Sequence, residues 1–521
     1  MKKIFHFIYC VVILSVFAGC DKGFEELNVD PNSISGEDFH PGFLFSNAQV
    51  STVYGDDETS LYYGSAFVQH VASLSDLGIF NYQGDKYVYL ESPNDQLWES
   101  SYENMVKLIQ DIIYNTKEKP EYHNLYQMAR IWKTIIFHRL TDIYGDVPYS
   151  EAGRAFYEQI YRPKYDAQKE IYADMLKELE EAVNAIDDKQ DNFSEFDIVY
   201  KGNLDKWKKL GHSMMLRLGM RMTKVDPGAA ESWVKKAING GVLESNRDNL
   251  IINATDASGA VDYLTNGMSF ILRVRTSTAG KISKTFFDFM KNHNDPRLKH
   301  TVAVYNDPND IGTENTDPAV QKGLPNGLNR VTLENDPSYD PSLPAQEHQY
   351  SGVKRNVYAK LNGPRILVSY PEMAFLSAEA AVRGWISEDA EELYEDGVAS
   401  AMKLLQQYDE SAIVTDEEIK TYLTENPFVG LSDTEAALEQ INTQFWAATF
   451  LNGYEAYANV RRSGYPVLTP VNYPDNETGG KFPRRLKYPK NEQVMNADHY
   501  KEAIARQGAD EFLTPVWWDA D

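Results

Sequence analysis

Apolar residues at helical spacing are the dominant pattern of this chain. Across residues 168–186 they return at every third or fourth position, which gives a helix one apolar face. Asp166 precedes this stretch and is placed to cap its first turn. The same spacing predicts further helices over residues 125–140, 204–222, 229–238, 282–290, 371–384, 390–405 and 438–460. The chain is therefore predicted to be all-α.

Small residues separate the large ones in several of these stretches, for example at Ala374, Ala378 and Ala381. Small side chains let helices approach closely and pack as antiparallel pairs, as they do in tetratricopeptide arrays. The predicted helix starts near 123, 168, 204 and 229 are unevenly spaced, so no strict repeat of about 34 residues exists. We expect irregular helix pairs.

The pattern changes over residues 241–365, where helical spacing becomes scarce and Gly, Asn, Asp and Pro accumulate. Residues 253–259 and 306–312 are examples of such loop-forming stretches. Residues 78–92 form a second such region, which is rich in aromatic side chains. Binding residues tend to gather on loops that a rigid scaffold carries, so these regions are predicted to hold the ligand.

The first twenty residues predict export and lipid attachment. Lys2 and Lys3 precede an apolar core over residues 4–16, and Ala18 and Gly19 supply small residues before Cys20. This arrangement resembles the lipobox of bacterial lipoproteins, in which the cysteine is acylated. The core is too short for a membrane-spanning helix, which needs about 20 residues. We predict a signal peptide over 1–19, a lipidated tether over 20–40 and one domain over 41–521.

The cysteine count agrees with lipidation. The chain has two cysteines, and Cys10 lies in the core that would be removed, so Cys20 would have no partner for a disulfide. The alternative is an ordinary secreted protein with a chance cysteine. Asp21 follows the cysteine, and in enteric bacteria this residue favours retention at the inner membrane.

Composition and motifs exclude several classes of function. The formal charge of −26 disfavours nucleic acid as a partner, because phosphate binding relies on basic surface. No nucleophile elbow, zinc-protease helix or phosphate-binding loop occurs in the sequence. Asp307 begins a stretch that looks like a calcium loop, but Pro318 stands where the loop needs Glu. We therefore predict no metal, no cofactor and no catalytic residue, although a carboxylate pair for glycoside hydrolysis stays open.

Several strings along the chain resemble the SusD/RagB family of outer-membrane nutrient-binding lipoproteins. They follow one order over nearly the whole mature chain. They are residues 24–32, 140–149, 165–166, 206–210, 216–218, 295–298, 372–385, 452–455, 461–466, 488–489 and 515–519.

This resemblance implies an all-helical SusD-like fold with four irregular tetratricopeptide-like helix pairs and a loop-rich ligand-binding portion. It also implies a lipid-anchored protein on the outer membrane, facing the cell exterior. Such a protein captures oligosaccharides for a SusC-like TonB-dependent transporter. Two alternatives remain: the same scaffold with a peptide or another nutrient as cargo, or a surface glycoside hydrolase.

The ligand-contact candidates combine aromatic rings with polar side chains on the loops. A sugar ring has a face of C–H groups that lies on an aromatic ring, while its hydroxyl groups need polar partners. The candidates are Asn81, Tyr82, Tyr87, Tyr263, Asn266, Phe270, Arg275, Tyr305 and Tyr350. By contrast, we expect Arg461 and Arg462 to pair with carboxylates or carbonyls, and Trp517 and Trp518 to pack down the chain end.

Overall fold

The structure is a computed structural model that describes residues 40–75, 84–255, 265–274, 280–307, 310–342 and 349–520. Residues Gly42–Asp521 form one compact unit, and Met1–Pro41 form another. The predicted signal peptide, Cys20 and all of the tether except His40 lie outside the described residues. Among the helices that are described, none is long and apolar enough to span a membrane.

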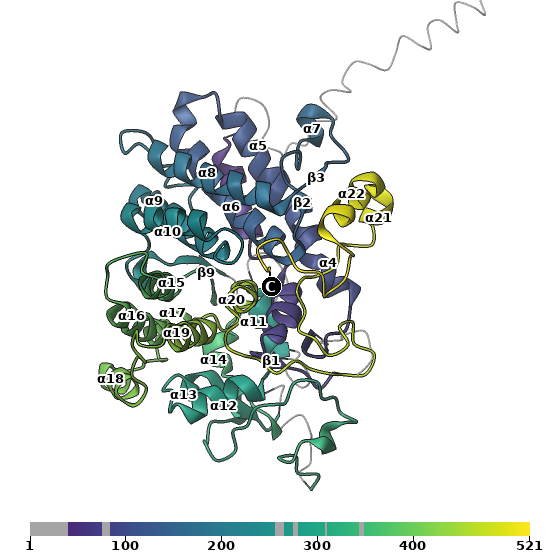
Figure 1. Cartoon of the computed structure of the whole chain (residues 1–521), viewed down its shortest axis with the longest axis vertical. Coiled ribbons are helices and arrows are strands. Elements are labelled where there is room, and N and C mark those ends of the chain that lie inside the picture. The colour runs from purple at the N-terminus through teal and green to yellow at the C-terminus, as the bar shows by residue number, and fades with distance from the viewer. Residues whose placement is uncertain are drawn as a thin grey trace, which may run out of the picture. The chain divides into compact units, whose positions relative to one another are not determined.

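Helices make up most of the unit from Gly42 to Asp521, which confirms the all-α prediction (Figure 1). The α-helices are α3 (Gly42–Ser51), α4 (Glu91–Ser100), α5 (Lys107–Thr116), α6 (His123–Tyr144), α7 (Ala155–Glu158), α8 (Gln168–Ala185), α9 (Leu204–Arg221), α10 (Pro227–Gly240), α11 (Gly267–Val274), α12 (Lys284–Asn292), α13 (Leu298–Thr301), α14 (Arg355–Tyr358), α15 (Tyr370–Val382), α16 (Ala390–Lys403), α17 (Leu405–Tyr408), α18 (Asp416–Glu425), α19 (Thr434–Ala448), α20 (Gly453–Ser463), α21 (Glu492–Met495) and α22 (Ala497–Gln507). The described residues also form the π-helical segments η2 (Thr59–Ser65) and η4 (Ser101–Val106) and the 3-10 turns η3 (Gly84–Lys86), η5 (Pro120–Tyr122), η6 (Asn246–Asp248), η7 (Ile311–Thr313) and η8 (Leu333–Asn335).

Neighbouring helices pack in chain order: α5 on α6, α6 on α8, α8 on α9, and α9 on α10. Side chains at the helix ends explain where two of these helices begin. Asn203 accepts a hydrogen bond from the backbone of α9, and Asp226 does the same for α10, whose first residue is Pro227. The short turn between α9 and α10 makes them a helical hairpin. The four tetratricopeptide-like pairs stay a prediction.

The second group of helices is α15, α16 and α19, which pack on one another. Ser369 and Glu372 form a capping box at the start of α15. Close packing explains Gly397 of α16, because a Cβ there would lie 2.6 Å from the ring of Phe375. One continuous hydrophobic core joins both helix groups, and Trp132, Trp207, Trp446 and Trp518 are fully buried in it.

Short strands occur mostly in the predicted loop-rich region. They are β1 (Val71–Ala72), β2 (Val147–Pro148), β3 (Tyr165–Asp166), β4 (Leu250–Asn253), β5 (Lys281–Ile282), β6 (Val302–Tyr305), β7 (Glu314–Asn315), β8 (Gly352–Val353) and β9 (Pro364–Val368). One sheet has the order β1-β5-β8-β6-β7, and the pairs β2-β3 and β4-β9 stand apart from it. All of these strands pair antiparallel. The sheet therefore joins chain segments that are far apart in sequence.

Two local predictions are wrong. Asp166 does not cap α8; it belongs to β3, and its carboxylate accepts hydrogen bonds from Ser150. The backbone of Gln168 donates instead to Asp146. The predicted helix over 438–460 is two helices, α19 and α20, separated at Leu451, where the backbone has φ of 66° and leaves the helical region.

Candidate functional site

Part of the predicted site cannot be placed. Asn81, Tyr82, Tyr263 and Arg275 lie outside the described residues.

Tyr305 and Tyr350 are buried in the sheet region. The hydroxyl of Tyr305 donates to a carboxylate oxygen of Glu314 at 2.9 Å, which ties β6 to β7. The hydroxyl of Tyr350 donates to Asp336 at 2.6 Å. Both hydroxyl groups therefore have partners within the protein, and both rings help to hold the loops together.

The other three described candidates occupy different surroundings. Tyr87 is fully buried, with its ring centroid 5.8 Å from that of Phe67. Asn266 is buried and caps α11, since its side-chain oxygen accepts from the backbone of Ser269 at 3.1 Å. Phe270 lies on α11 and is half-buried. A role in ligand contact for these residues stays a proposal.

The chain on both sides of residues 76–83 is held by a buried cluster of Ser73, Asp85 and Lys86. The ammonium of Lys86 donates to the carbonyl oxygen of Ser73 at 2.6 Å and pairs with Asp85 at 3.0 Å. The backbone of Ser73 donates to the same carboxylate at 3.2 Å. Burial raises the pKa of Asp85, and the charge of Lys86 opposes that rise. This cluster fixes where the segment with Asn81 and Tyr82 begins and ends.

Tyr473 and Asn329 form a surface that we call the Tyr473 face, and the buried Lys86 lies next to it. The Asn329 oxygen accepts from the backbone of Val331 and Thr332 at 2.9 and 2.8 Å, which orients its amide. That amide donates to the Tyr473 hydroxyl at 2.8 Å. The Tyr473 ring is half-buried, and the Lys86 ammonium lies 6.0 Å from its centroid. The face combines an aromatic ring with fixed polar groups.

The pairing of β1 with β5 brings together described residues that adjoin two of the predicted stretches in sequence. Ala72 at the end of β1 is the pairing partner of Lys281 at the start of β5. In an antiparallel pair, the end of one strand lies beside the start of the other. The described residues after β1 and those before β5 therefore meet at the same end of this strand pair, and in sequence they adjoin the stretches that contain Asn81, Tyr82 and Arg275.

A separate surface pocket of about 350 Å³ lies between α3, β4 and β9. Its volume is within the range of small-molecule sites. Tyr54, Asn253, Asn266 and Arg365 line it. The amide of Asn266 donates to backbone carbonyls next to β9, and Arg365 pairs with Asp57, so these two polar groups serve the fold.

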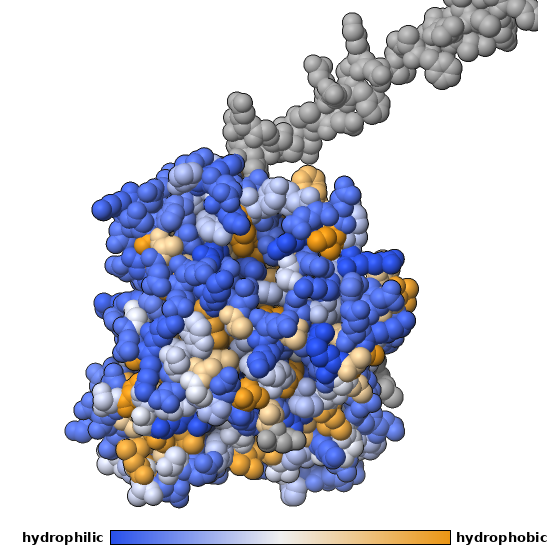
Figure 2. Space-filling view, turned by 45° about the horizontal axis from the view of Figure 1, so that its top comes forward, coloured by the Kyte–Doolittle hydropathy of each residue, from blue (hydrophilic) through white to orange (hydrophobic). Residues whose placement is uncertain are grey.

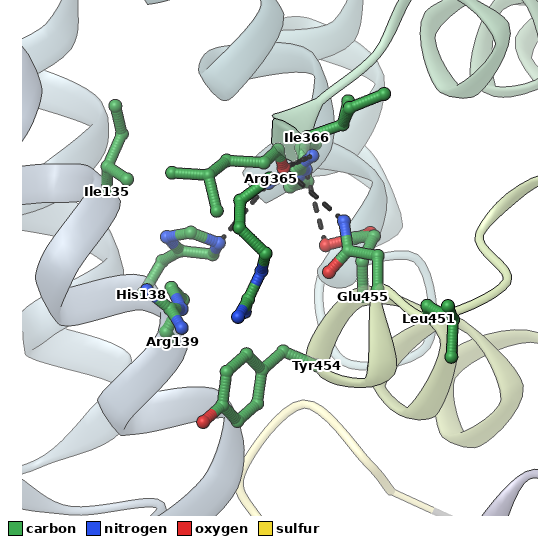
Figure 3. Close-up of a pocket in the computed structure, with 11 residues that line it drawn as sticks. Ile135, His138, Arg139, Arg365, Ile366, Leu451, Tyr454 and Glu455 are labelled. Carbon is green, nitrogen blue, oxygen red and sulfur yellow. Dashed lines mark hydrogen bonds and ion pairs between the residues drawn. The ribbon is translucent and has the colours of Figure 1, made fainter. Parts of the chain in front are cut away.

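A second pocket lies in the interior and is lined by polar and charged side chains of α6, β9 and α20 (Figure 3). Figure 3 shows His138 and Arg139 reaching in from α6, Arg365 from β9, and Tyr454 and Glu455 from α20. The Arg139 guanidinium lies 4.5 Å from the Tyr454 ring centroid. The cavity measures only about 20 Å³, which is room for about one water. It is therefore too small for a sugar ring and belongs to the structural core.

Arg217 links the elements around this interior pocket. It donates to Glu372 at 2.6 Å and to the Leu367 carbonyl at 3.1 Å, and it pairs with Glu455 at 3.3 Å. Its guanidinium also faces the His138 ring at 3.3 Å. Burial lowers the pKa of His138 to about 4, so its imidazole is neutral at pH 7 and can accept from Arg217. The network joins α6, α9, α15 and α20.

A family comparison identifies the fold. The family model described as "Starch-binding associating with outer membrane", a SusD-like model, matches residues 31–489. The chain belongs to the SusD-like family. A search of curated proteins finds no match.

Solved structures agree with this SusD-like assignment. A chitin-binding protein has 33% sequence identity and a TM-score of 0.79, with 92% of this chain and 100% of that chain covered. A SusD-like protein of Bacteroidetes has 27% identity and a TM-score of 0.82, with 93% and 100% covered. A chitin-binding SusD homolog from Flavobacterium johnsoniae has 24% identity and a TM-score of 0.72, with 92% and 98% covered, and shows the fold alone.

Sequence reasoning missed Tyr473 and Asn329 in this SusD-like chain. Both lie in loops, and each neighbouring stretch holds Gly, Asn and Pro, which is the pattern that marked the other loops. Tyr473 lies outside the two regions predicted to hold the ligand, 78–92 and 241–365, and Asn329 lies inside the second without an aromatic neighbour to mark it. Only the fold shows that residues 329 and 473 are in contact.

Proposed function

We propose that this protein captures oligosaccharides at the cell surface, without cleaving them, and passes them to a TonB-dependent outer-membrane transporter. The observation that carries the proposal is the family match over residues 31–489, together with a chitin-binding relative at 33% identity over 92% of the chain. Oligosaccharides of chitin type are therefore the first ligands to test, with starch oligosaccharides second.

The Tyr473 face suits a sugar chemically. The half-buried ring of Tyr473 offers an apolar surface to the C–H face of a sugar. Asn329 supplies an amide group beside the ring for sugar hydroxyl groups. We favour this face over the 350 Å³ pocket because Lys86, which lies next to the Tyr473 ring, is bonded to Ser73, and both are close in sequence to the predicted contacts Asn81 and Tyr82.

The proposed anchoring is a lipid on Cys20. One acyl chain binds a membrane only weakly, so stable attachment needs more than one chain on the processed N-terminus. A tether of about 20 extended residues reaches roughly 65 Å, at about 3.3 Å per residue. Such a tether lets the binding domain move over a transporter in the same membrane.

Affinity gel electrophoresis tests the proposed activity. We expect retarded migration of the purified protein in gels that contain a soluble chitin derivative or starch, and unchanged migration in plain gels. Tyr82→Ala and Tyr263→Ala test the two aromatic candidates outside the described residues. Wild-type retardation of either variant would remove that residue from the site, and no retardation of the wild-type protein by any polysaccharide would contradict glycan capture.

Replacing Tyr473 with alanine should weaken glycan binding about tenfold, which corresponds to about 1.4 kcal/mol. The loss follows from removing the ring against which the sugar packs. Isothermal titration with the ligand found by electrophoresis measures it. Tyr54→Ala is the matched control, because Tyr54 is a partly exposed tyrosine (38%) that lines the other pocket. If Tyr473→Ala binds the glycan as tightly as wild type and Tyr54→Ala binds it more weakly, the binding site is the 350 Å³ pocket and not the Tyr473 face.

A peptide cargo is the alternative that keeps the same scaffold. Genes for glycoside hydrolases beside the gene for this protein would favour sugar, and genes for peptidases would favour peptide. Turnover of any glycan by the purified protein would instead favour a surface hydrolase.

A further inference from the structure

Aromatic side chains of α5 and α7 meet at the surface. Figure 1 shows where these two helices lie in the fold. The rings of Tyr114 and Tyr157 are stacked, with centroids 3.7 Å apart and planes 20° apart. Asn115 donates to the Tyr157 hydroxyl at 2.9 Å and also to Asp111 at 2.9 Å. These contacts hold the Tyr157 ring in one orientation.

Phe156 projects beside the stacked rings of Tyr114 and Tyr157. Its ring meets Tyr157 edge to face at 5.1 Å, and 87% of the residue is exposed. Tyr114 is 58% exposed, and Tyr161 in the following loop is 76% exposed. We call Tyr114, Phe156 and Tyr157 the aromatic knob. Most of the face in Figure 2 is hydrophilic, with its apolar groups in small patches, so aromatic rings this exposed mark an interaction site.

The geometry of the knob favours a protein partner over a sugar. A sugar chain needs open, similarly oriented ring faces, but Tyr114 and Tyr157 cover one face of each other. Phe156 stands nearly perpendicular to Tyr157, at 89°, and has no hydroxyl group. A protruding ring on a rigid base is instead the form of an interface hot spot, in which an aromatic anchor fills a pocket of the partner.

Charge argues against a second copy of this chain as that partner. Each copy carries a formal charge of −26, so two copies repel one another. The family description, by contrast, names association with the outer membrane. In sequence, α3 is the first described helix after the proposed tether. It packs on α5, which carries Tyr114 of the knob. The knob is therefore part of the same group of helices as α3.

We propose that the aromatic knob inserts into an apolar recess on the outer face of the partner transporter, with Phe156 as the anchor. This inference rests on the proposed function, since it names the surface through which that function's partner is held. The recess needs a neutral or basic rim to accept a protein of this charge.

Co-purification from solubilised outer membranes tests the proposal with the full-length, tagged protein. We expect wild type to recover a barrel-sized companion, and Phe156→Ala to recover at least tenfold less. Tyr161→Ala should give a smaller loss. Val494→Ala is the matched control, because Val494 is another highly exposed apolar residue, at 77%, on α21. It should recover the wild-type amount. Thermal unfolding of each purified variant should match wild type, because these side chains are exposed.

Each other outcome overturns the inference in a distinct way. Equal recovery of the companion by Phe156→Ala and wild type would show that the knob is not its anchor. Normal recovery with weakened glycan binding would make the knob a sugar contact, and normal recovery with loss from lipid vesicles would make it a membrane contact. If wild type recovers no companion, the delivery step of the proposed function fails, and the inference fails with it.

Discussion

Replacing Arg462 with alanine should lower the free energy of unfolding by about 3–5 kcal/mol, because it leaves a buried carboxylate without its main partner. Arg462 and Glu379 are almost fully buried, and two guanidinium nitrogens lie 2.8 and 2.7 Å from the carboxylate oxygens. Asn442 and Asn459 accept further hydrogen bonds from the same guanidinium. The measurement is chemical denaturation at pH 7.

The size of this loss should depend on pH. Burial raises the pKa of Glu379, but the charges and hydrogen bonds of Arg462 and Arg383 outweigh burial. The pKa of Glu379 therefore falls to about 2, from an ordinary value of 4.5. A carboxyl with a lowered pKa stabilises the fold above pH 4.5, and this stabilisation is lost as the pH falls from about 4.5 towards 2. Arg462→Ala lacks most of this stabilisation. The difference in the free energy of unfolding between Arg462→Ala and wild type should therefore shrink over that pH range.

Two controls make the result specific. Lys235→Ala removes an exposed pair with Glu231 on α10 and should cost at most about 1 kcal/mol. A double variant, Arg462→Met with Glu379→Leu, removes both charges and should be more stable than Arg462→Ala. A loss below about 1 kcal/mol in Arg462→Ala would show that this pair does not join α15 to α20.

Replacing Gly453 with alanine should destabilise the fold by about 3 kcal/mol or more, because α20 and η2 touch through their backbones at this point. A Cβ on Gly453 would lie 2.0 Å from the Ser60 carbonyl oxygen and 2.7 Å from the Ser65 nitrogen. Backbone atoms cannot move aside as a flexible side chain can. A Cβ on Gly64 would likewise lie 2.6 Å from the carbonyl carbon of Gly453.

Gly228→Ala is the matched control for this substitution. Gly228 lies in the first turn of α10, and nothing stands within 4 Å of its Cβ position. Alanine favours a helix over glycine by up to about 1 kcal/mol, so this variant should be as stable as wild type or slightly more stable. Both variants are compared by denaturant midpoint. Equal stability of Gly453→Ala and wild type would contradict the close approach of α20 and η2.

The sequence predicted the helical frame well because helix periodicity is a local signal. Residues 204–222 and 229–238 match α9 and α10 closely, and Arg462 and Trp518 are buried structural residues as expected. The break between α19 and α20 was missed because the apolar spacing continues through Leu451. It is visible only in the backbone, where Leu451 adopts a positive φ.

The candidate site was harder to predict because a binding surface is made by segments that meet only in three dimensions. Composition marked residues 241–365 as loop-rich, and the structure places most of its short strands there, but composition could not separate buried from exposed rings. Tyr305 and Tyr350 resemble Tyr473 in sequence context, yet they are buried at the strands that hold the loops. The contact between Asn329 and Tyr473 spans 144 residues, so no local pattern reveals it.

Titration calorimetry of the purified mature protein against chitin oligosaccharides and starch oligosaccharides tests the central claim most directly. The account predicts saturable binding of an oligosaccharide that is recovered intact, by mass spectrometry, after prolonged incubation. Absence of heat with every oligosaccharide, or recovery of shortened products, would contradict a surface protein that captures glycans without cleaving them.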